Sequence, residues 1–205
     1  MPDRLETEIK LPLEDAVAVR EALIQAGAIS QGRYDELNIR FDDARRTLTR
    51  QGMILRLRRT EGGGDLFYTL TVKTRPEDAD SAILSRREIE LTIGDAEAMS
   101  AILEVLGYRP YWRYEKRREV FTWRRAEAVL DEMPYGWFLE IEGGEDDIRD
   151  LIAAVGLSLE DGLPYSYAEI FENIRRNLNL DAMDLTFEAF QGIEVTFEAY
   201  LPPNA

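Results

Sequence analysis

The feature that most constrains the fold is a regular alternation of polar and apolar residues along several short segments of the chain. In residues 5–11, Glu6, Glu8 and Lys10 fall on one side of the alternation and mostly apolar residues fall on the other. A period of two is typical of a β-strand with one buried face. The strands predicted in this way are residues 5–11, 37–41, 53–58, 66–74, 85–93, 114–123, 128–132 and 137–142.

Segments with a helical period separate these strands. A Gly stands just after each of three of these segments, where it supplies the left-handed backbone that ends a helix. Asp95 and Ser166 stand where N-caps belong, and Asp42 is interpreted as a turn or cap residue. The predicted helices are residues 13–26, 95–106, 145–155 and 166–178, and the glycines are Gly27, Gly107 and Gly156.

Charge distribution decides between two kinds of sheet. A simple antiparallel sheet with a solvated charged face is the common interpretation of such strands. However, same-sign charges recur along single strand faces, as in Glu6 with Glu8 and Arg56 with Arg58, and a solvated face gains nothing from that repulsion. All three lysines of the chain, Lys10, Lys73 and Lys116, also fall on these faces. We therefore expect an α+β fold in which an eight-stranded antiparallel β-barrel encloses the ionic face, with helices packed on its exterior.

Composition restricts the chemistry that such an interior can perform. The 205 residues include no His and no Cys, which excludes thiol nucleophiles, disulfides, Cys/His zinc sites and a Ser-His-Asp triad. A metal ion would have to be a hard cation such as Mg²⁺ or Mn²⁺, held through carboxylate oxygens. Paired glutamates together with several Arg and Lys side chains match a triphosphate bound through such a metal.

Composition also bears on partners and location. The formal net charge of −15 argues against a nucleic-acid partner. No apolar run approaches the ~20 residues of a membrane span, and the first residues lack the apolar region of a signal peptide. We expect a cytoplasmic protein with no membrane partner, present as a monomer or a homodimer. Residues 1–178 are predicted to form the barrel domain, and residues 179–205 a C-terminal appendage of unknown role made of two short amphipathic pieces.

The ionic segments resemble a known family. Glu6-x-Glu8-x-Lys10 is similar to the Glu-x-Glu-x-Lys signature of the CYTH superfamily, the triphosphate tunnel metalloenzymes, which include class IV adenylate cyclases and thiamine triphosphatases. The resemblance covers residue 1 to about residue 178, in order. Further motifs that resemble the family are Phe41-Asp42, Leu55-Arg56-Leu57-Arg58, Thr71-x-Lys73, Arg86-x-Glu88-x-Glu90, Lys116-x-Arg118, Asp131, Glu140-x-Glu142 and Ser166-Tyr167.

The resemblance implies a role for each matching side chain. Glu6, Glu8 and Lys10 are the expected catalytic residues. The implied metal ligands are Glu6, Glu8, Glu140 and Glu142, with Glu88, Glu90 and Asp131 as further candidates, although Glu90 and Asp131 fit a structural ion pair almost equally well. The implied triphosphate-binding residues are Lys10, Arg56, Arg58, Lys73, Arg86, Lys116 and Arg118. Ser166 is expected to be an N-cap rather than a nucleophile, and Trp112, Tyr114 and Trp123 are expected to be core or rim aromatics.

Three functions remain open on this basis. The first is a metal-dependent triphosphatase acting on a small molecule such as tripolyphosphate, a nucleoside triphosphate or thiamine triphosphate. The second is a class IV adenylate cyclase, which the resemblance makes less favoured because the His-Phe that precedes the signature in bacterial cyclases is missing. The third is a non-catalytic triphosphate-binding module.

Overall fold

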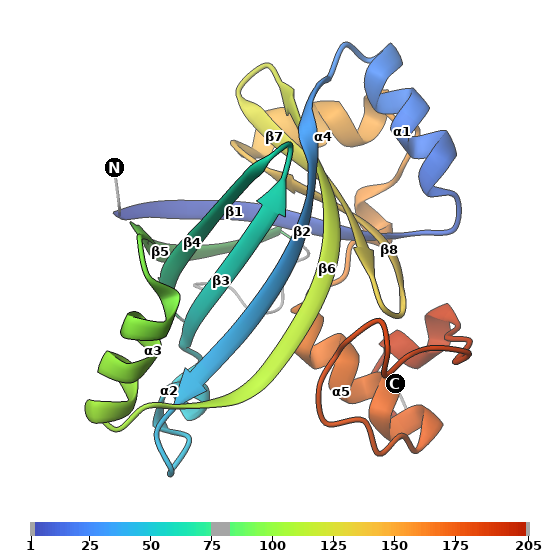
Figure 1. Ribbon diagram of the computed structural model, residues 1–205. Helices are drawn as coiled ribbons and strands as arrows, with labels where there is room; N and C mark the ends of the chain where they lie inside the picture. The colour runs from blue at the N-terminus through green and yellow to red at the C-terminus, as the bar shows by residue number, and fades with distance from the viewer. Residues whose placement is uncertain (1–2, 75–82, 204–205) are drawn as a thin grey trace.

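A computed structural model of the chain describes residues 3–74 and 83–203 and contains a closed antiparallel barrel (Figure 1). The order of strands around the barrel is β1-β5-β4-β3-β2-β6-β7-β8. This confirms the predicted α+β fold with an eight-stranded barrel. The strands are β1 (Asp3–Leu13), β2 (Ile29–Asp42), β3 (Ile54–Gly62), β4 (Asp65–Lys73), β5 (Ile83–Ile93), β6 (Arg109–Trp123), β7 (Ala126–Met133) and β8 (Gly136–Glu142).

Two strands are much longer than their alternation predicts. The predicted strand at residues 37–41 is part of β2, which begins at Ile29, and the one at residues 114–123 is part of β6, which begins at Arg109. The added residues of β2 are mostly exposed and show no clean alternation, so their sequence gives little signal. They become a strand because β2 and β6 pair along almost their whole lengths, from Ile29 opposite Thr122 to Asp42 opposite Arg109.

The helices are α1 (Ala16–Gln25), α2 (Thr47–Arg50), α3 (Ala96–Val105), α4 (Glu145–Ala154) and α5 (Tyr167–Leu178). The Asp95 side chain accepts from the Ala98 N–H, and Ser166 forms a reciprocal capping box with Glu169, so both predicted N-caps are confirmed. Gly27, Gly107 and Gly156 have φ of 87°, 93° and 76°, as the predicted helix stops require. None of the helices in the described part of the chain is both long and apolar enough to cross a membrane.

The short helix α2 is absent from the prediction. Its one turn is fixed by Asp42, whose carboxylate accepts from the backbone N–H groups of Leu48 and Thr49 at 3.0 and 2.9 Å. A four-residue helix carries no periodic signal of its own, and it forms because a buried carboxylate satisfies its free N–H groups. The cap role expected for Asp42 is confirmed.

Apolar cores lie outside the barrel wall. Helices α1 and α4 cover β1, β6, β7 and β8, where Leu23, Ile148 and Leu151 are completely buried. Helix α3 covers a smaller cluster that includes Leu55 and Leu103 on the flank of β2, β3 and β4 (Figure 1). Because the apolar faces of the strands are used on the outside, their charged faces are directed into the barrel.

The C-terminal tail packs on the half of β6 that extends beyond β7. Leu185 is fully buried, accepts from the Glu115 N–H at 2.9 Å and donates to the Arg113 carbonyl at 3.0 Å. Further along, the Tyr200 hydroxyl donates to the Tyr135 carbonyl at 3.0 Å. These contacts make one apolar cluster of α5, the tail and this end of the barrel. The tail therefore completes a sheet edge that β7 leaves uncovered.

Candidate active site

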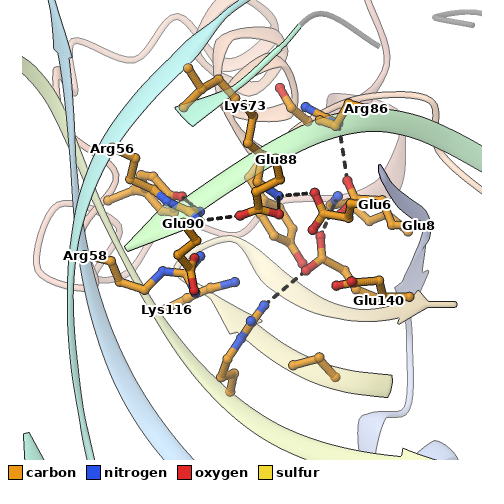
Figure 2. Close-up of a pocket in the computed structure, with 18 of the residues that line it drawn as sticks. Glu6, Glu8, Arg56, Arg58, Lys73, Arg86, Glu88, Glu90, Lys116 and Glu140 are labelled. Carbon is orange, nitrogen blue, oxygen red and sulfur yellow. Dashed lines mark hydrogen bonds and ion pairs between the residues drawn. The ribbon is translucent and has the colours of Figure 1, made fainter. Parts of the chain in front are cut away.

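The barrel interior contains a cavity of about 330 Å³ whose wall is mostly ionic (Figure 2). All but one of the fourteen residues predicted for the site line it, and the exception is Asp131. The predicted residues on the wall are Glu6, Glu8, Lys10, Arg56, Arg58, Lys73, Arg86, Glu88, Glu90, Lys116, Arg118, Glu140 and Glu142.

Strand register explains why these side chains meet. Residues directly opposite each other in an antiparallel pair project from the same face of the sheet. Glu6 lies opposite Arg86 across β1 and β5, and Lys73 lies opposite Glu88 across β4 and β5. Each pair therefore sets an acid beside a base on the inner face, and the alternation in the sequence repeats this arrangement around the wall.

Seven of the eight cations on the wall are paired with carboxylates among the described residues. Lys10 contacts Glu140 at 2.7 Å, Arg86 contacts Glu8 at 3.3 Å, and Lys73 contacts Glu6. Eight cations and seven glutamates line the cavity, so its charges nearly balance despite the strongly acidic total. A polyanion that enters such a cavity can replace these carboxylates on the cations, provided that a divalent cation takes the carboxylates that are released.

A row of glutamates crosses three neighbouring strands at one side of the cavity. Glu8 on β1 lies opposite Glu142 on β8, and Glu142 lies opposite Glu127 on β7. Three like charges in adjacent register positions repel one another, which a bound cation would relieve. In residues 3–74 and 83–203 no three acidic side chains are close enough to form a ready-made metal centre. The donors nevertheless fit a hard divalent ion, because all of them are carboxylates.

Glu140 adds a second carboxylate on β8 beside this row. Burial alone would raise the pKa of Glu140, but Lys10, Lys116 and Arg118 outweigh it and hold the pKa well below its usual value. The group is therefore ionised throughout the physiological pH range. It can accept from Lys10, as it does here, or serve as an anionic oxygen ligand.

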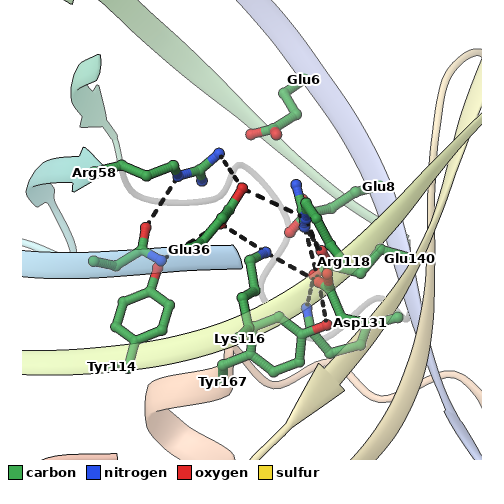
Figure 3. Close-up of polar contacts among 12 residues, drawn as sticks. Glu6, Glu8, Glu36, Arg58, Tyr114, Lys116, Arg118, Asp131, Glu140 and Tyr167 are labelled. Atoms are coloured by element: carbon green, nitrogen blue, oxygen red, sulfur yellow. Dashed lines mark hydrogen bonds and ion pairs between the residues drawn. The ribbon is translucent and has the colours of Figure 1, made fainter. Parts of the chain in front are cut away.

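Asp131 lies behind the cavity wall in a fully buried polar cluster (Figure 3). It accepts from Lys116 at 3.0 Å, from Arg118 at 2.8 and 2.9 Å, and from the Tyr167 hydroxyl at 2.9 Å. Its two oxygens thus take four donors. In this arrangement Asp131 orients two of the cations that face the cavity.

Glu36 belongs to the same cluster and was not predicted. Its carboxylate lies 3.3 Å from Arg58 and 3.6 Å from Lys116. Burial would raise the pKa of Glu36, but Arg58, Lys116 and Arg118 lower it far below the ordinary value. The sequence carried a signal for this residue, since Glu36 would share the inner face with Asn38 once the predicted strand is extended by one residue.

The cavity wall also includes residues that the sequence analysis missed, namely Arg40, Glu127, Tyr114 and Tyr167. Glu127 was missed because the predicted strand began at residue 128, although it has the same parity as Asp131. Trp112 and Trp123 are buried in apolar clusters, as expected. Tyr114 is also buried in an apolar cluster, as expected, and its hydroxyl in addition meets Arg56 Nη1 at 3.2 Å in the cavity.

Tyr114 has an unusual acidity. Burial would raise its pKa, but Arg56, Arg40, Lys116 and Arg58 lower the pKa to about 8. We expect one tyrosine of the ligand-free protein to ionise near this pH, and Tyr114→Phe to abolish that step in a titration followed by ultraviolet absorbance. Because the pKa is lowered on folding, ionisation stabilises the folded state as the pH rises from about 8 to 10, and this stability is lost as the pH falls through 8. A wild-type titration without that step would contradict the assignment.

The fold and the wall together define a class of protein: a closed barrel whose interior pairs cations with carboxylates and offers a metal only oxygen ligands. The chain belongs to the CYTH family, since the family model of the CYTH domain matches residues 4–187. This is a family of enzymes that generally depend on divalent metal ions.

The chain is also similar to a curated relative and, in fold, to several solved structures. A candidate adenylate cyclase of Methanocaldococcus jannaschii is 27% identical over 177 residues, which cover 81% of this chain and 98% of the relative. The solved structure of PH1819 from Pyrococcus horikoshii matches with a TM-score of 0.68 and 22% identity, over 82% of this chain and 98% of the other. That of HpAC1 from Hippeastrum, described as a candidate adenylyl cyclase with a dominant triphosphatase activity, matches with a TM-score of 0.62 and 19% identity, over 82% and 95%.

Proposed function

We propose that this protein is a divalent-metal-dependent triphosphatase that binds a small-molecule triphosphate inside the barrel and hydrolyses it. The observation that carries the proposal is the nearly balanced set of eight cations and seven glutamates on the cavity wall. A triphosphate brings several negative charges, and its metal ion brings two positive ones. The phosphate oxygens can therefore take the Arg and Lys donors while the metal takes the glutamates that those cations release.

The metal ligands in this proposal are Glu6, Glu8, Glu140 and Glu142. Mg²⁺ or Mn²⁺ at these carboxylates would neutralise phosphate oxygens and favour attack by water on the terminal phosphorus. Both ions prefer carboxylate oxygen, and Glu8 and Glu142 already lie opposite each other on the inner face. Without a substrate, Glu6, Glu8 and Glu140 are compensated by Lys73, Arg86 and Lys10, which contact them in the wall.

The cations have a separate role, which is to hold the phosphate chain in line and to stabilise charge on the leaving group. Arg56 and Arg58 on β3 can form forked hydrogen bonds with phosphate oxygens, for which the planar guanidinium is suited. Lys10 contacts Glu140, so it can donate to a phosphate oxygen close to the metal ligands. In phosphoryl transfer such positioning and electrostatic stabilisation supply most of the catalysis.

A second candidate function is adenylate cyclisation, which uses the same wall to present the α-phosphorus to a ribose hydroxyl. The name of the Methanocaldococcus jannaschii relative favours it. The triphosphatase activity described for the Hippeastrum protein favours hydrolysis within the same fold. Hydrolysis requires only the triphosphate site, for which the wall offers a full set of donors, and we therefore place it first.

The test is a product analysis with Mg²⁺ or Mn²⁺ and, in turn, tripolyphosphate, ATP and thiamine triphosphate. Metal-dependent release of orthophosphate supports the triphosphatase. Cyclic AMP with pyrophosphate from ATP would replace it with the cyclase. Tight binding of tripolyphosphate without turnover of any of the three compounds would indicate a binding module instead.

A further inference from the structure

Arg40 differs from every other cation on the cavity wall. Each of the other seven has a carboxylate oxygen within 4.0 Å. Arg40 has no such partner anywhere in residues 3–74 and 83–203, and its Nε, like those of Arg56 and Arg86, is buried without a hydrogen-bond partner among them. A guanidinium with an unsatisfied buried donor needs an acceptor from outside the chain.

Aromatic rings hold this guanidinium in place. Its central carbon lies 4.9 Å from the centroid of the Trp112 ring and 6.0 Å from that of Tyr114. Trp112 and Tyr114 stack on each other with centroids 4.7 Å apart, so they form a rigid support. Cation–π contacts fix the position of the charge but leave its hydrogen-bonding edge free.

The position of Arg40 is also electrostatically unfavourable without a ligand. Arg40 lies directly opposite Arg56 across β2 and β3, and like charges in that register repel each other. A shift in the β2–β6 register follows immediately after Arg40, which is a common device for directing a side chain. An anion between the two guanidinium groups would turn this repulsion into two attractive contacts.

Arg40 stands where the ionic cavity meets a second cavity. The second cavity measures about 420 Å³ and shares Arg40, Ile54, Arg86 and Ser166 with the first. The rest of its wall is mostly uncharged, with Met53, Leu84, Tyr111, Pro164 and Ala168 among its residues, and it also includes Glu169 and Glu172. An anion at Arg40 would therefore occupy the end of the phosphate chain that faces this less ionic space.

We propose that Arg40 is an additional phosphate-binding residue that contacts the phosphate group at the end of the bound chain facing the second cavity. This inference rests on the proposed triphosphate substrate and adds to it a binding residue with no counterpart among the predicted ones. The phosphate can be the α-phosphate of an organic triphosphate or a terminal phosphate of inorganic tripolyphosphate. In both cases the guanidinium donates a hydrogen bond to a phosphate oxygen.

The experiment measures dissociation constants of tripolyphosphate and ATP by titration calorimetry with a chelator present, and KM values with Mg²⁺. Arg40→Gln should weaken binding of both compounds by about 10- to 100-fold, the value of a hydrogen bond to a charged group. Arg40→Lys keeps the positive charge but loses the forked guanidinium. Its affinity for both compounds should lie between those of the wild type and Arg40→Gln. Arg46→Gln is the matched control, because Arg46 stacks at 3.6 Å on Tyr111 but does not line the ionic cavity.

The outcomes separate this inference from the proposed function. If the wild type neither binds nor hydrolyses tripolyphosphate or ATP, the proposed function fails and the Arg40 inference fails with it. If the wild type is active and both Arg40 variants match it in affinity and KM, only the Arg40 inference is overturned. A loss for ATP alone would also overturn it, since Arg40 would then recognise the organic group. Loss of thermal stability with unchanged affinity would reduce Arg40 to a structural residue.

Discussion

Replacing Glu8 with Gln should lower metal-dependent turnover by about a thousandfold, or ~4 kcal/mol of activation free energy. The amide keeps the shape of the side chain and can still accept from Arg86, which contacts Glu8 at 3.3 Å. It cannot supply the negative charge that a divalent metal requires. The change also removes one like charge from the row formed with Glu142 and Glu127, which offsets the weakened pair with Arg86, so the fold should lose little stability.

The measurement is the initial rate of phosphate release from tripolyphosphate over a range of Mg²⁺ concentrations, together with a thermal unfolding curve. Glu132→Gln is a matched control because Glu132 lies on barrel strand β7 but pairs outside the cavity, with Arg117 at 3.2 Å. This control should keep wild-type kinetics. Unchanged activity of the Glu8 variant would remove Glu8 from the proposed metal ligands.

Much of the site could be predicted because strand parity is a rigid constraint. In a closed barrel every second residue faces inward. If one charged residue faces the interior, the residue two positions further along the strand is therefore expected to face the interior as well. Arg56 and Arg58, or Glu140 and Glu142, follow this rule from the sequence alone. The sequence could not give the pairing of strands, because nothing in β1 by itself identifies β5 and β8 as its neighbours.

The residues that escaped prediction depend on tertiary contacts. Arg40 lies within a predicted strand, but the position of its guanidinium depends on Trp112 and Tyr114 on β6, which are far away in the sequence. The tail segment around Leu185 has no strand-like alternation and pairs with β6 because β7 ends early. Such features arise from length mismatches between neighbouring strands, which local patterns do not record.

The buried cluster around Asp131 shows how a ligand-free polyanion site can remain folded. Several cations converge on one interior, and their mutual repulsion must be compensated when no phosphate is present. Asp131 and Glu36 do this from behind the wall, where they leave the cavity-facing side of Lys116 and Arg118 available. On this basis we propose that Asp131 acts through the cations it orients rather than through a metal.

Asp131→Asn should therefore cost about 3–5 kcal/mol of unfolding free energy, the usual effect of removing one partner from a buried ion pair. Asp131 is fully buried and takes four donors, so its loss leaves Lys116 and Arg118 undercompensated in a low-dielectric environment. Urea unfolding measures the change, and Glu132→Gln, on the outer face of the same strand, should shift it by no more than about 0.5 kcal/mol.

Addition of tripolyphosphate distinguishes the two roles that the sequence left open for Asp131. If Asp131 compensates the charges of Lys116 and Arg118, a bound polyanion can take over that role in the variant. In metal-free solution, tripolyphosphate should then raise the stability of Asp131→Asn more than it raises that of the wild type. If Asp131 were a metal ligand, the variant would instead keep its stability and require much more Mg²⁺ for activity. The four donors around its carboxylate favour the first result, because Oδ2 already accepts three hydrogen bonds and Oδ1 accepts one from Arg118.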